Sequence, residues 1–230
     1  VDGGAVETGV NASPGRFSFD NESPRHAVQL QPHEIANRLV TNTEYAAFIQ
    51  DGGYTTPELW LSDGWATVKR EGWTAPLYWQ PDGEHHFTLG GVQALSPDAP
   101  VAYVSFYEAD AFARWAGARL PTEAEWEHSA AGQTVAGNFA EDDYWQTAPG
   151  TGQWFGDCWE WTASAYSAYP GFQPLRGTLG EYNGKFMCNQ MTVRGGSCLS
   201  ARDHLRATYR SFFYPHQRWQ CLGLRLAKDA

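Results

Sequence analysis

The first half of the chain contains three stretches whose apolar residues recur at the three- and four-residue spacing of an amphipathic helix. These stretches are residues 40–49, 105–116 and 122–131. Each has, near its start, a Ser, Thr or Asn that can cap a helix and a glutamate in the first turn. Gly117 follows the second stretch and fits a C-terminal cap. The pattern therefore predicts three helices before residue 132.

Elsewhere the pattern predicts short strands. Alternating or apolar runs occur in four places, at residues 17–19, 27–30, 191–194 and 222–226. Beyond Gly132, glycine, asparagine, aspartate and aromatic residues interrupt any helical periodicity. The chain has no fixed-period repeat and no low-complexity linker, so we expect residues 1–230 to form a single α+β domain.

The chain is rich in aromatic residues and carries a net negative charge. The chain has 11 Trp, 11 Tyr and 12 Phe with 24 Gly and 13 Pro, which favours a loop-rich fold held by large side chains. The formal net charge of −10 should repel phosphate backbones and anionic lipids, so we expect neither a nucleic-acid nor a membrane partner. Residues 1–10 lack the basic flank and apolar stretch of a signal peptide, so a cytoplasmic location is expected.

The four cysteines lie in the C-terminal third, at Cys158, Cys188, Cys198 and Cys221. No two of them have the spacing of a zinc knuckle. An even number allows two disulfides, whereas free thiols are usual in cytosolic proteins. We expect four reduced thiols, with disulfides as the alternative.

Six strings spread over nearly the whole chain resemble the formylglycine-generating-enzyme superfamily. They are VTNTEY (40–45), PVAYVS (100–105), RLPTEAEWE (119–127), GDCWEWT (156–162), RGGS (194–197) and GLRLA (223–227). The resemblance implies an irregular C-type-lectin-like fold, loop-rich, with few helices and short antiparallel strands. The superfamily's namesake uses two cysteines shortly after its Arg-Gly-Gly-Ser, but the comparable stretch here has only Cys198. Formylglycine generation is therefore not expected.

Five further strings resemble the iron-dependent sulfoxide synthases (hercynine oxygenases) of ergothioneine-type biosynthesis. They are FDNE (19–22), DGGY (51–54), WLSDGW (60–65), YPGF (169–172) and EYNGKFM (181–187). These enzymes use O2 and non-haem iron to join a sulfur donor to the imidazole of trimethylhistidine (hercynine). The resemblance implies that this chain is the C-terminal, substrate-binding half of such an enzyme and is nearly inactive by itself.

Metal ligation is the second implication of this resemblance. In these synthases three histidines of a preceding helical domain hold Fe(II), and we expect that domain to be absent from this chain. An iron site needs converging imidazoles, yet no two of the seven histidines are three or four residues apart. Asp157 and Glu160 are candidate calcium ligands, because superfamily relatives bind calcium near this string and oxygen ligands suit that ion. The alternative is that both are ordinary turn and strand carboxylates.

Candidate substrate contacts gather near the C-terminus, at Arg206, Arg210, Ser211, Phe212, Phe213 and Gln217. The two arginines could bind a carboxylate, or could pair with acidic residues of the protein itself. Phe212 and Phe213 could form a wall against a quaternary ammonium group, or could pack in the core. Ser211 stands where the family pattern has Asn, so the polar contacts of that Asn cannot be carried over.

The donor and the catalytic acid are the remaining expectations. Relatives that use gamma-glutamylcysteine resemble Arg-Asn-Trp-Asp followed by an Arg, and that Asp and Arg hold the charged groups of the donor. Phe213 and Gln217 occupy these two positions, so we expect cysteine or another small donor. Tyr166 and Tyr169 are candidate acids, since a tyrosine hydroxyl can give up a proton within hydrogen-bond reach. A non-catalytic lectin-like binding module and an enzyme with a seleno- or thiosugar donor are the alternatives.

Overall fold

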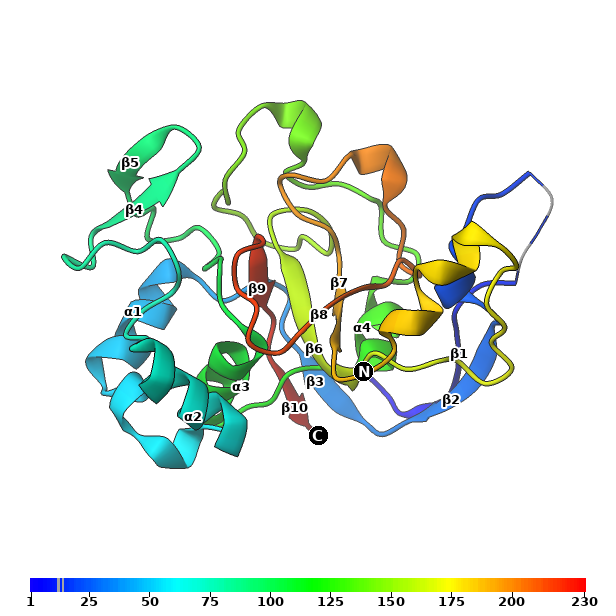
Figure 1. Cartoon of the computed structure of the whole chain (residues 1–230), viewed down its shortest axis with the longest axis horizontal. Coiled ribbons are helices and arrows are strands. Elements are labelled where there is room, and N and C mark those ends of the chain that lie inside the picture. The colour runs from blue at the N-terminus through cyan, green and yellow to red at the C-terminus, as the bar shows by residue number, and fades with distance from the viewer. Residues whose placement is uncertain (12, 14) are drawn as a thin grey trace.

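The computed structural model describes residues 1–11, 13 and 15–230. Short elements are joined by long loops, as Figure 1 shows. The helices are α1 (Asn42–Gln50), α2 (Ser62–Glu71), α3 (Phe106–Trp115) and α4 (Glu123–Ala130). The strands are β1 (Gly4–Thr8), β2 (His26–Leu30), β3 (His33–Ile35), β4 (His85–Thr88), β5 (Gly91–Ala94), β6 (Trp159–Ala165), β7 (Met191–Arg194), β8 (Ser211–Phe213), β9 (Leu222–Leu224) and β10 (Ala227–Asp229).

A four-stranded sheet with the order β8-β7-β6-β9 lies at the centre of the molecule (Figure 1). β7 pairs antiparallel with both β6 and β8, whereas β6 and β9 run parallel, with Trp159 opposite Leu222. Three two-stranded sheets, β1-β2, β3-β10 and β4-β5, surround it. Helices α1, α2 and α3 lie together on one side of the sheet, and β1 and β2 lie on the other side (Figure 1). The predicted α+β class is confirmed.

The three predicted helices are confirmed, and each starts with a capping box. The side chains of Thr41, Ser105 and Thr122 accept hydrogen bonds from the backbone N–H three residues later. Helix α2 was not predicted, because its first residue follows Leu61, which offers no capping side chain, and because Gly64 lies inside it. It ends at Gly72, which adopts the left-handed conformation.

The strand predictions are confirmed at 27–30 and 191–194, which fall in β2 and β7. The predicted strand at 222–226 is shorter, since β9 ends at Leu224. The strand predicted at 17–19 was wrong: these residues have no partner strand among those that the structure describes, and Phe17 is exposed. Alternation of apolar and polar residues thus predicts a strand only where a neighbouring strand is available.

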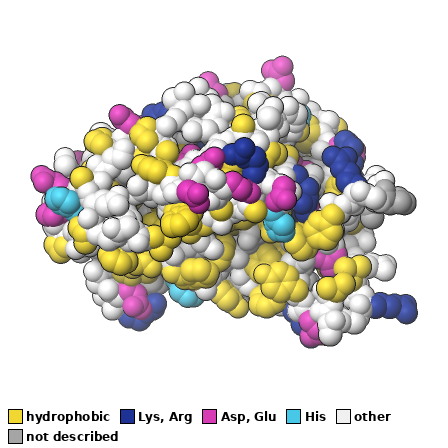
Figure 2. All heavy atoms as spheres, turned by 90° about the horizontal axis from the view of Figure 1, so that it is seen from above, with side chains coloured by type: hydrophobic (Ala, Val, Ile, Leu, Met, Phe, Trp, Pro, Cys, Tyr) yellow, Lys and Arg dark blue, Asp and Glu magenta, His cyan; other side chains and the backbone are white. Residues whose placement is uncertain are grey.

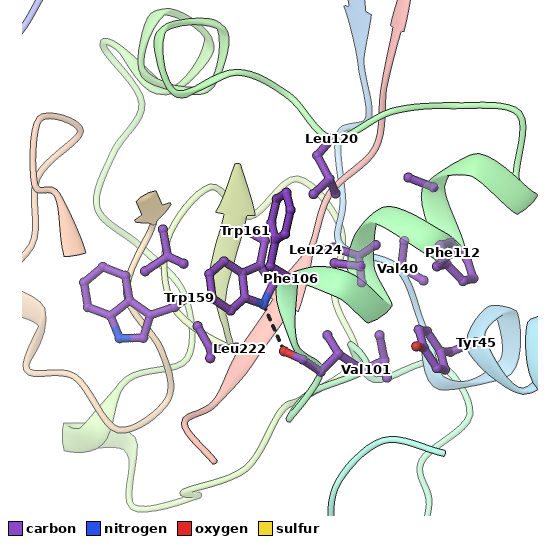
Figure 3. Close-up of a cluster of buried hydrophobic side chains, with 14 of the residues drawn as sticks. Val40, Tyr45, Val101, Phe106, Phe112, Leu120, Trp159, Trp161, Leu222 and Leu224 are labelled. Atoms are coloured by element: carbon purple, nitrogen blue, oxygen red, sulfur yellow. Dashed lines mark hydrogen bonds between the residues drawn. The ribbon is translucent and has the colours of Figure 1, made fainter. Parts of the chain in front are cut away.

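The hydrophobic core lies between helices α1 and α3 and the central sheet (Figure 3). Tyr45 of α1 stacks on Phe112 of α3 with ring centroids 5.3 Å apart. Trp161 of β6 is fully buried, packs against Phe106, and donates its indole N–H to the Val104 carbonyl at 2.9 Å. Its polar atom is therefore satisfied inside the core.

A buried ion network joins α4 to the sheet. Arg194 at the end of β7 has no exposed surface, and its Nη2 donates to Glu123 at 2.7 Å and to Glu127 at 2.8 Å. Arg210, just before β8, donates from Nε to the same Glu123 at 2.5 Å. Two guanidinium groups therefore share one buried carboxylate, and that carboxylate belongs to the first turn of α4.

Three of the four free cysteines are buried next to one another. The Cys221 Sγ lies 3.8 Å from that of Cys198 and 4.0 Å from that of Cys158. These distances are about twice the length of a disulfide bond. Burial raises the pKa of the Cys158 thiol, which keeps it protonated at neutral pH. Only Cys188 is exposed among them.

Removing the shared carboxylate should strongly destabilise the fold. The substitution Glu123→Gln leaves two buried guanidinium groups short of negative charge, so the free energy of unfolding should fall by about 3 kcal/mol at pH 7. Glu44→Gln is the matched control, because its partner Arg38 and Glu44 itself are more than a third exposed, and it should cost less than about 1 kcal/mol. Urea unfolding of both variants is the measurement.

The same carboxylate should make stability depend on acid pH. Burial alone would raise the pKa of Glu123, but Arg194 and Arg210 outweigh burial and hold the pKa below its usual value. Its contribution is therefore complete above the unfolded-state pKa near 4.5 and is lost as pH falls through the lower folded-state value. The difference between wild type and Glu123→Gln should thus shrink below about pH 4. An equal difference at pH 7 and pH 3 contradicts this account.

Thiol reactivity should follow the burial of the cysteines. Ellman's reagent should label about one thiol in the folded chain, at Cys188, and four after denaturation. Cys188→Ser should abolish the reaction of the folded chain and leave three thiols in denaturant. Fewer than four thiols in the denatured wild type would instead reveal a disulfide.

Candidate functional site

An aromatic cluster forms where β8 meets the segment 178–187. Phe212 of β8 stacks on Tyr166 with ring centroids 4.1 Å apart and an interplanar angle of 14°. The rings of Phe186 and Tyr182 lie 5.7 and 6.0 Å from Phe212. Tyr182 is 62% exposed and Phe186 is 39% exposed. These four residues, called the aromatic platform below, offer ring faces and edges to solvent from a buried base.

Phe213 does not join this platform, because neighbouring residues of a strand point to opposite faces. Its ring packs against Trp161 of the core at 6.4 Å and against Trp219 at 5.7 Å. The single wall expected from Phe212 and Phe213 is therefore divided between two faces of the sheet. Gln217 accepts a hydrogen bond from the Tyr214 backbone N–H at 3.0 Å, so it closes the turn after β8.

The two candidate acids have different surroundings. The Tyr166 oxygen accepts a hydrogen bond from Asn21 Nδ2 at 2.9 Å, and Tyr166 lines a cleft of about 510 Å³ together with Tyr107 and His216. Tyr169 lies in the ion network, where its hydroxyl accepts from Arg194 at 3.0 Å and faces Glu123 at 3.4 Å. Burial is the main reason that the pKa of each tyrosine is raised.

Arg210 and Arg206 both pair with acidic residues of the chain. The Arg210 side chain is 1% exposed and directs its donors to Glu123, to the Asn21 carbonyl at 2.8 Å and to the Ser167 carbonyl at 2.9 Å. Arg206 donates from Nε at 2.8 Å, and also from Nη2, to the buried Glu22. It remains 25% exposed and borders a cleft of about 470 Å³.

The two candidate calcium ligands, Asp157 and Glu160, have different hydrogen-bond partners. Both Glu160 oxygens accept from Arg225 at 2.8 Å, and one also accepts the indole N–H of Trp126 at 2.9 Å. Asp157 Oδ1 accepts from Asn138 and from the Ala148 backbone, and burial raises the pKa of Asp157. Within residues 1–11, 13 and 15–230, no three His, Cys, Asp or Glu side chains come together as a metal site. Glu160 is thus fully engaged by donors of the protein, whereas Asp157 Oδ2 is buried and has no hydrogen-bond partner among the residues that the structure describes.

Three residues of the site were not singled out from the sequence, namely Asn21, Tyr182 and Phe186. All three lie in strings that carried the family resemblance, FDNE (19–22) and EYNGKFM (181–187). The resemblance thus contained the signal, but no spacing rule connects these strings with β8. Their proximity arises from contacts across the chain, such as that of Asn183 Nδ2 with Asp20 Oδ1 at 2.6 Å.

Apolar side chains gather along one side of the molecule in Figure 2, which views it from above. Several large apolar residues in or near the platform are exposed, namely Leu175, Leu179, Tyr182, Phe186 and Tyr214. An apolar surface of this kind is typical of a binding or docking face. In the part of the chain that the structure describes, no helix has the length and apolar character needed to cross a membrane.

Curated relatives cover all or nearly all of this chain. It is 36% identical over 259 residues to the hercynine oxygenase of Mycolicibacterium smegmatis, covering 100% of this chain and 60% of that protein. It is 35% identical over 249 residues to the hercynine oxygenase of Mycobacterium tuberculosis, covering 96% of this chain and 58% of that protein. The chain thus spans less than two thirds of these relatives. The formylglycine-generating enzyme of Streptomyces coelicolor is 32% identical over 266 residues, covering 93% of this chain and 83% of that enzyme.

Solved structures share the fold at lower identity. PvdO from Pseudomonas aeruginosa superposes with a TM-score of 0.64 at 20% identity, covering 100% of this chain and 93% of that one. The Treponema denticola variable protein 1 gives a TM-score of 0.59 at 18% identity, covering 99% of this chain and 95% of that one. The expected irregular, C-type-lectin-like architecture is confirmed. Because the sequence profile of the sulfatase-modifying factor enzyme 1-like domain matches residues 1–154 and 143–230, the chain belongs to this formylglycine-generating-enzyme family.

Proposed function

We propose that this chain is the substrate-binding half of an O2-dependent hercynine oxygenase of ergothioneine-type biosynthesis, a sulfoxide synthase that forms a carbon–sulfur bond. The observation that carries the proposal is the 35–36% identity, over nearly the whole chain, to relatives named hercynine oxygenase. The substrate would be trimethylhistidine, and the donor would be cysteine or another small thiol.

The aromatic platform supports this assignment because it suits a quaternary ammonium group. A trimethylammonium group has no N–H and is bound chiefly by aromatic faces, at about 0.5 to 2 kcal/mol for each good contact. Phe212, Phe186 and Tyr182 pack against one another, and Tyr182 and Phe186 are exposed, so such a group could lie on their outer surfaces. For the substrate carboxylate we favour Arg206 over Arg210, since Arg206 is partly exposed and Arg210 is enclosed.

Tyr166 is the better candidate for the acid. Tyr169 is surrounded by Arg194, Arg210 and Glu123, so its hydroxyl already serves the ion network. Tyr166 is the buried member of the platform and also lines a cleft, so we favour it as the group that would give a proton to a bound substrate. A tyrosine with a raised pKa holds its proton at neutral pH until a stronger base forms next to it.

Iron would have to come from residues outside this chain. We propose that a preceding helical domain supplies the Fe(II) ligands and docks on the apolar surface beside the platform, which includes Leu175, Leu179 and Tyr182. Bound iron would activate O2, and this chain would bind and orient the organic substrates. The relatives' additional length is consistent with such a domain.

If the iron ligands belong to a preceding domain, this chain alone should bind iron only weakly. After anaerobic incubation with Fe(II) and dialysis, the 230-residue chain should retain less than about 0.1 equivalent of iron, because its imidazoles do not converge. Elemental analysis is the measurement, and a full-length protein treated in the same way is the positive control. Stoichiometric iron in the isolated chain overturns the split-site proposal.

The donor preference is the second prediction. In the full-length protein, cysteine should be preferred over gamma-glutamylcysteine by on the order of a hundredfold, since two unpaired charged groups each cost roughly 1 to 3 kcal/mol. Phe213→Asp with Gln217→Arg should shift the preference toward the glutamyl donor. The measurement is the ratio of kcat/KM values for the two donors.

Each result of that comparison has a definite meaning. A wild-type preference for gamma-glutamylcysteine contradicts the donor assignment. Turnover of neither thiol, with turnover of a seleno- or thiosugar, identifies the alternative enzyme. Binding of trimethylhistidine by the full-length protein with no turnover of any donor supports a binding module instead.

A further inference from the structure

We propose that Asn21 is a positioning residue that holds the Tyr166 hydroxyl as a hydrogen-bond acceptor and thereby leaves its proton free for a bound ligand. This inference rests on the role proposed above for Tyr166. Asn21 lies in the string FDNE (19–22), and the inference depends on the contacts of its amide.

The backbone around Asn21 is fixed from both sides. Asn21 lies in the one-turn 3-10 helix Asp20–Glu22 and is 1% exposed. Its carbonyl accepts from Arg210 Nη1 at 2.8 Å. The next residue, Glu22, is fully buried, pairs with Arg206 and accepts the Thr208 hydroxyl at 2.6 Å. The amide therefore cannot move far from Tyr166 without breaking buried charged contacts.

The orientation of the amide follows from a second contact. Asn21 Nδ2 lies 2.9 Å from the Tyr166 oxygen and 3.3 Å from the Arg210 carbonyl oxygen. A backbone carbonyl can only accept, so the amide atom that faces it must be the NH2 group. The reverse orientation would place two acceptor oxygens next to each other. Asn21 is therefore the donor to Tyr166, and the single Tyr166 proton is not used in this bond.

The stacking of Tyr166 on Phe212 fixes the rest of the geometry. With the ring centroids of Tyr166 and Phe212 4.1 Å apart and the rings stacked, the hydroxyl proton can move only by rotation about the C–O bond. Arg210 lies 5.0 Å from the Tyr166 ring centroid, and Asp20 and Glu123 are the nearby acids. The Tyr169 hydroxyl, in contrast, faces the carboxylate of Glu123, which can accept its proton in a hydrogen bond.

Stability alone does not explain an asparagine at this place. Its Oδ1 is buried and has no hydrogen-bond partner among the residues that the structure describes. A buried acceptor without a partner is destabilising, and a group of this kind in a native protein calls for an explanation. Our explanation is that the asparagine is kept for its NH2 group, which donates to the Tyr166 oxygen, although its Oδ1 is left without a partner.

The first test uses the isolated chain and needs no activity. In 15N-labelled protein, the side-chain amide signals of Asn21 are assigned by their loss in Asn21→Ala. In Tyr166→Phe, which keeps the stacking and loses the hydroxyl, these signals should shift, whereas those of Asn183 should not. Asn183 is a suitable control because it is 5% exposed and donates to Asp20, the neighbour of Asn21. Unchanged Asn21 signals overturn the inference.

The second test is a double-mutant cycle on kcat in the full-length, iron-loaded protein. Asn21→Ala should lower kcat by about tenfold with little change in KM, because the ligand still binds but the proton is misplaced. Asn21→Ala should have no further effect in a Tyr166→Phe background. Asn21→Ser replaces Asn21→Ala if the latter fails to fold, and Asn183→Ala should stay within about twofold of wild type.

The outcomes separate this inference from the proposed function. Additive effects of Asn21→Ala and Tyr166→Phe on kcat show that Asn21 does not act through Tyr166, which overturns the inference. A kcat that Tyr166→Phe leaves unchanged removes Tyr166 from the proposed reaction. In that case the amide signals of the isolated chain still decide whether Asn21 orients the hydroxyl.

Discussion

Arg194 has no exposed surface, and the buried carboxylates of Glu123 and Glu127 balance its charge. Because a buried charge without a partner is very unfavourable, α4 and the end of β7 must come together in one geometry. Arg210 shares Glu123 and also donates to the Asn21 carbonyl, so the same network reaches β8 and the segment before β2. The buried ion pairs of this network therefore hold in place the segments that carry Tyr166 and Phe212 of the platform.

Helix capping and hydrophobic periodicity, which depend on neighbouring residues in the sequence, predicted three of the helices. Each predicted helix starts with a side chain that caps it, and α2, which starts without one, escaped prediction. The predicted strand at 17–19 failed because strand formation depends on a partner that the sequence does not identify. The resemblance, which depends on strings over the whole chain, predicted the architecture better than any single pattern did.

The site was predictable to a smaller extent, because its members come from segments far apart in sequence. Phe212 was singled out as an aromatic contact, but its partners Phe186 and Tyr182 lie about 30 residues away and only packing unites them. The pairing of Arg206 with Glu22 spans 184 residues, and no pattern could distinguish it from an arginine awaiting a substrate. A sequence therefore gives the kinds of side chains available, and packing decides which of them are already engaged.

The parallel pairing of β9 with β6 bears on how the protein is made. Leu222 and Leu224 are fully buried against the central sheet, and their partners Trp159 and Trp161 are translated about 60 residues earlier. During synthesis the tryptophan edge of β6 must wait, unpaired, until residues 222–224 have left the ribosome. Contacts this distant in sequence form late and slowly. While the residues between β6 and β9 are being synthesised, the nascent chain carries an open, aromatic strand edge, which chaperones could bind and which could cause aggregation during overexpression.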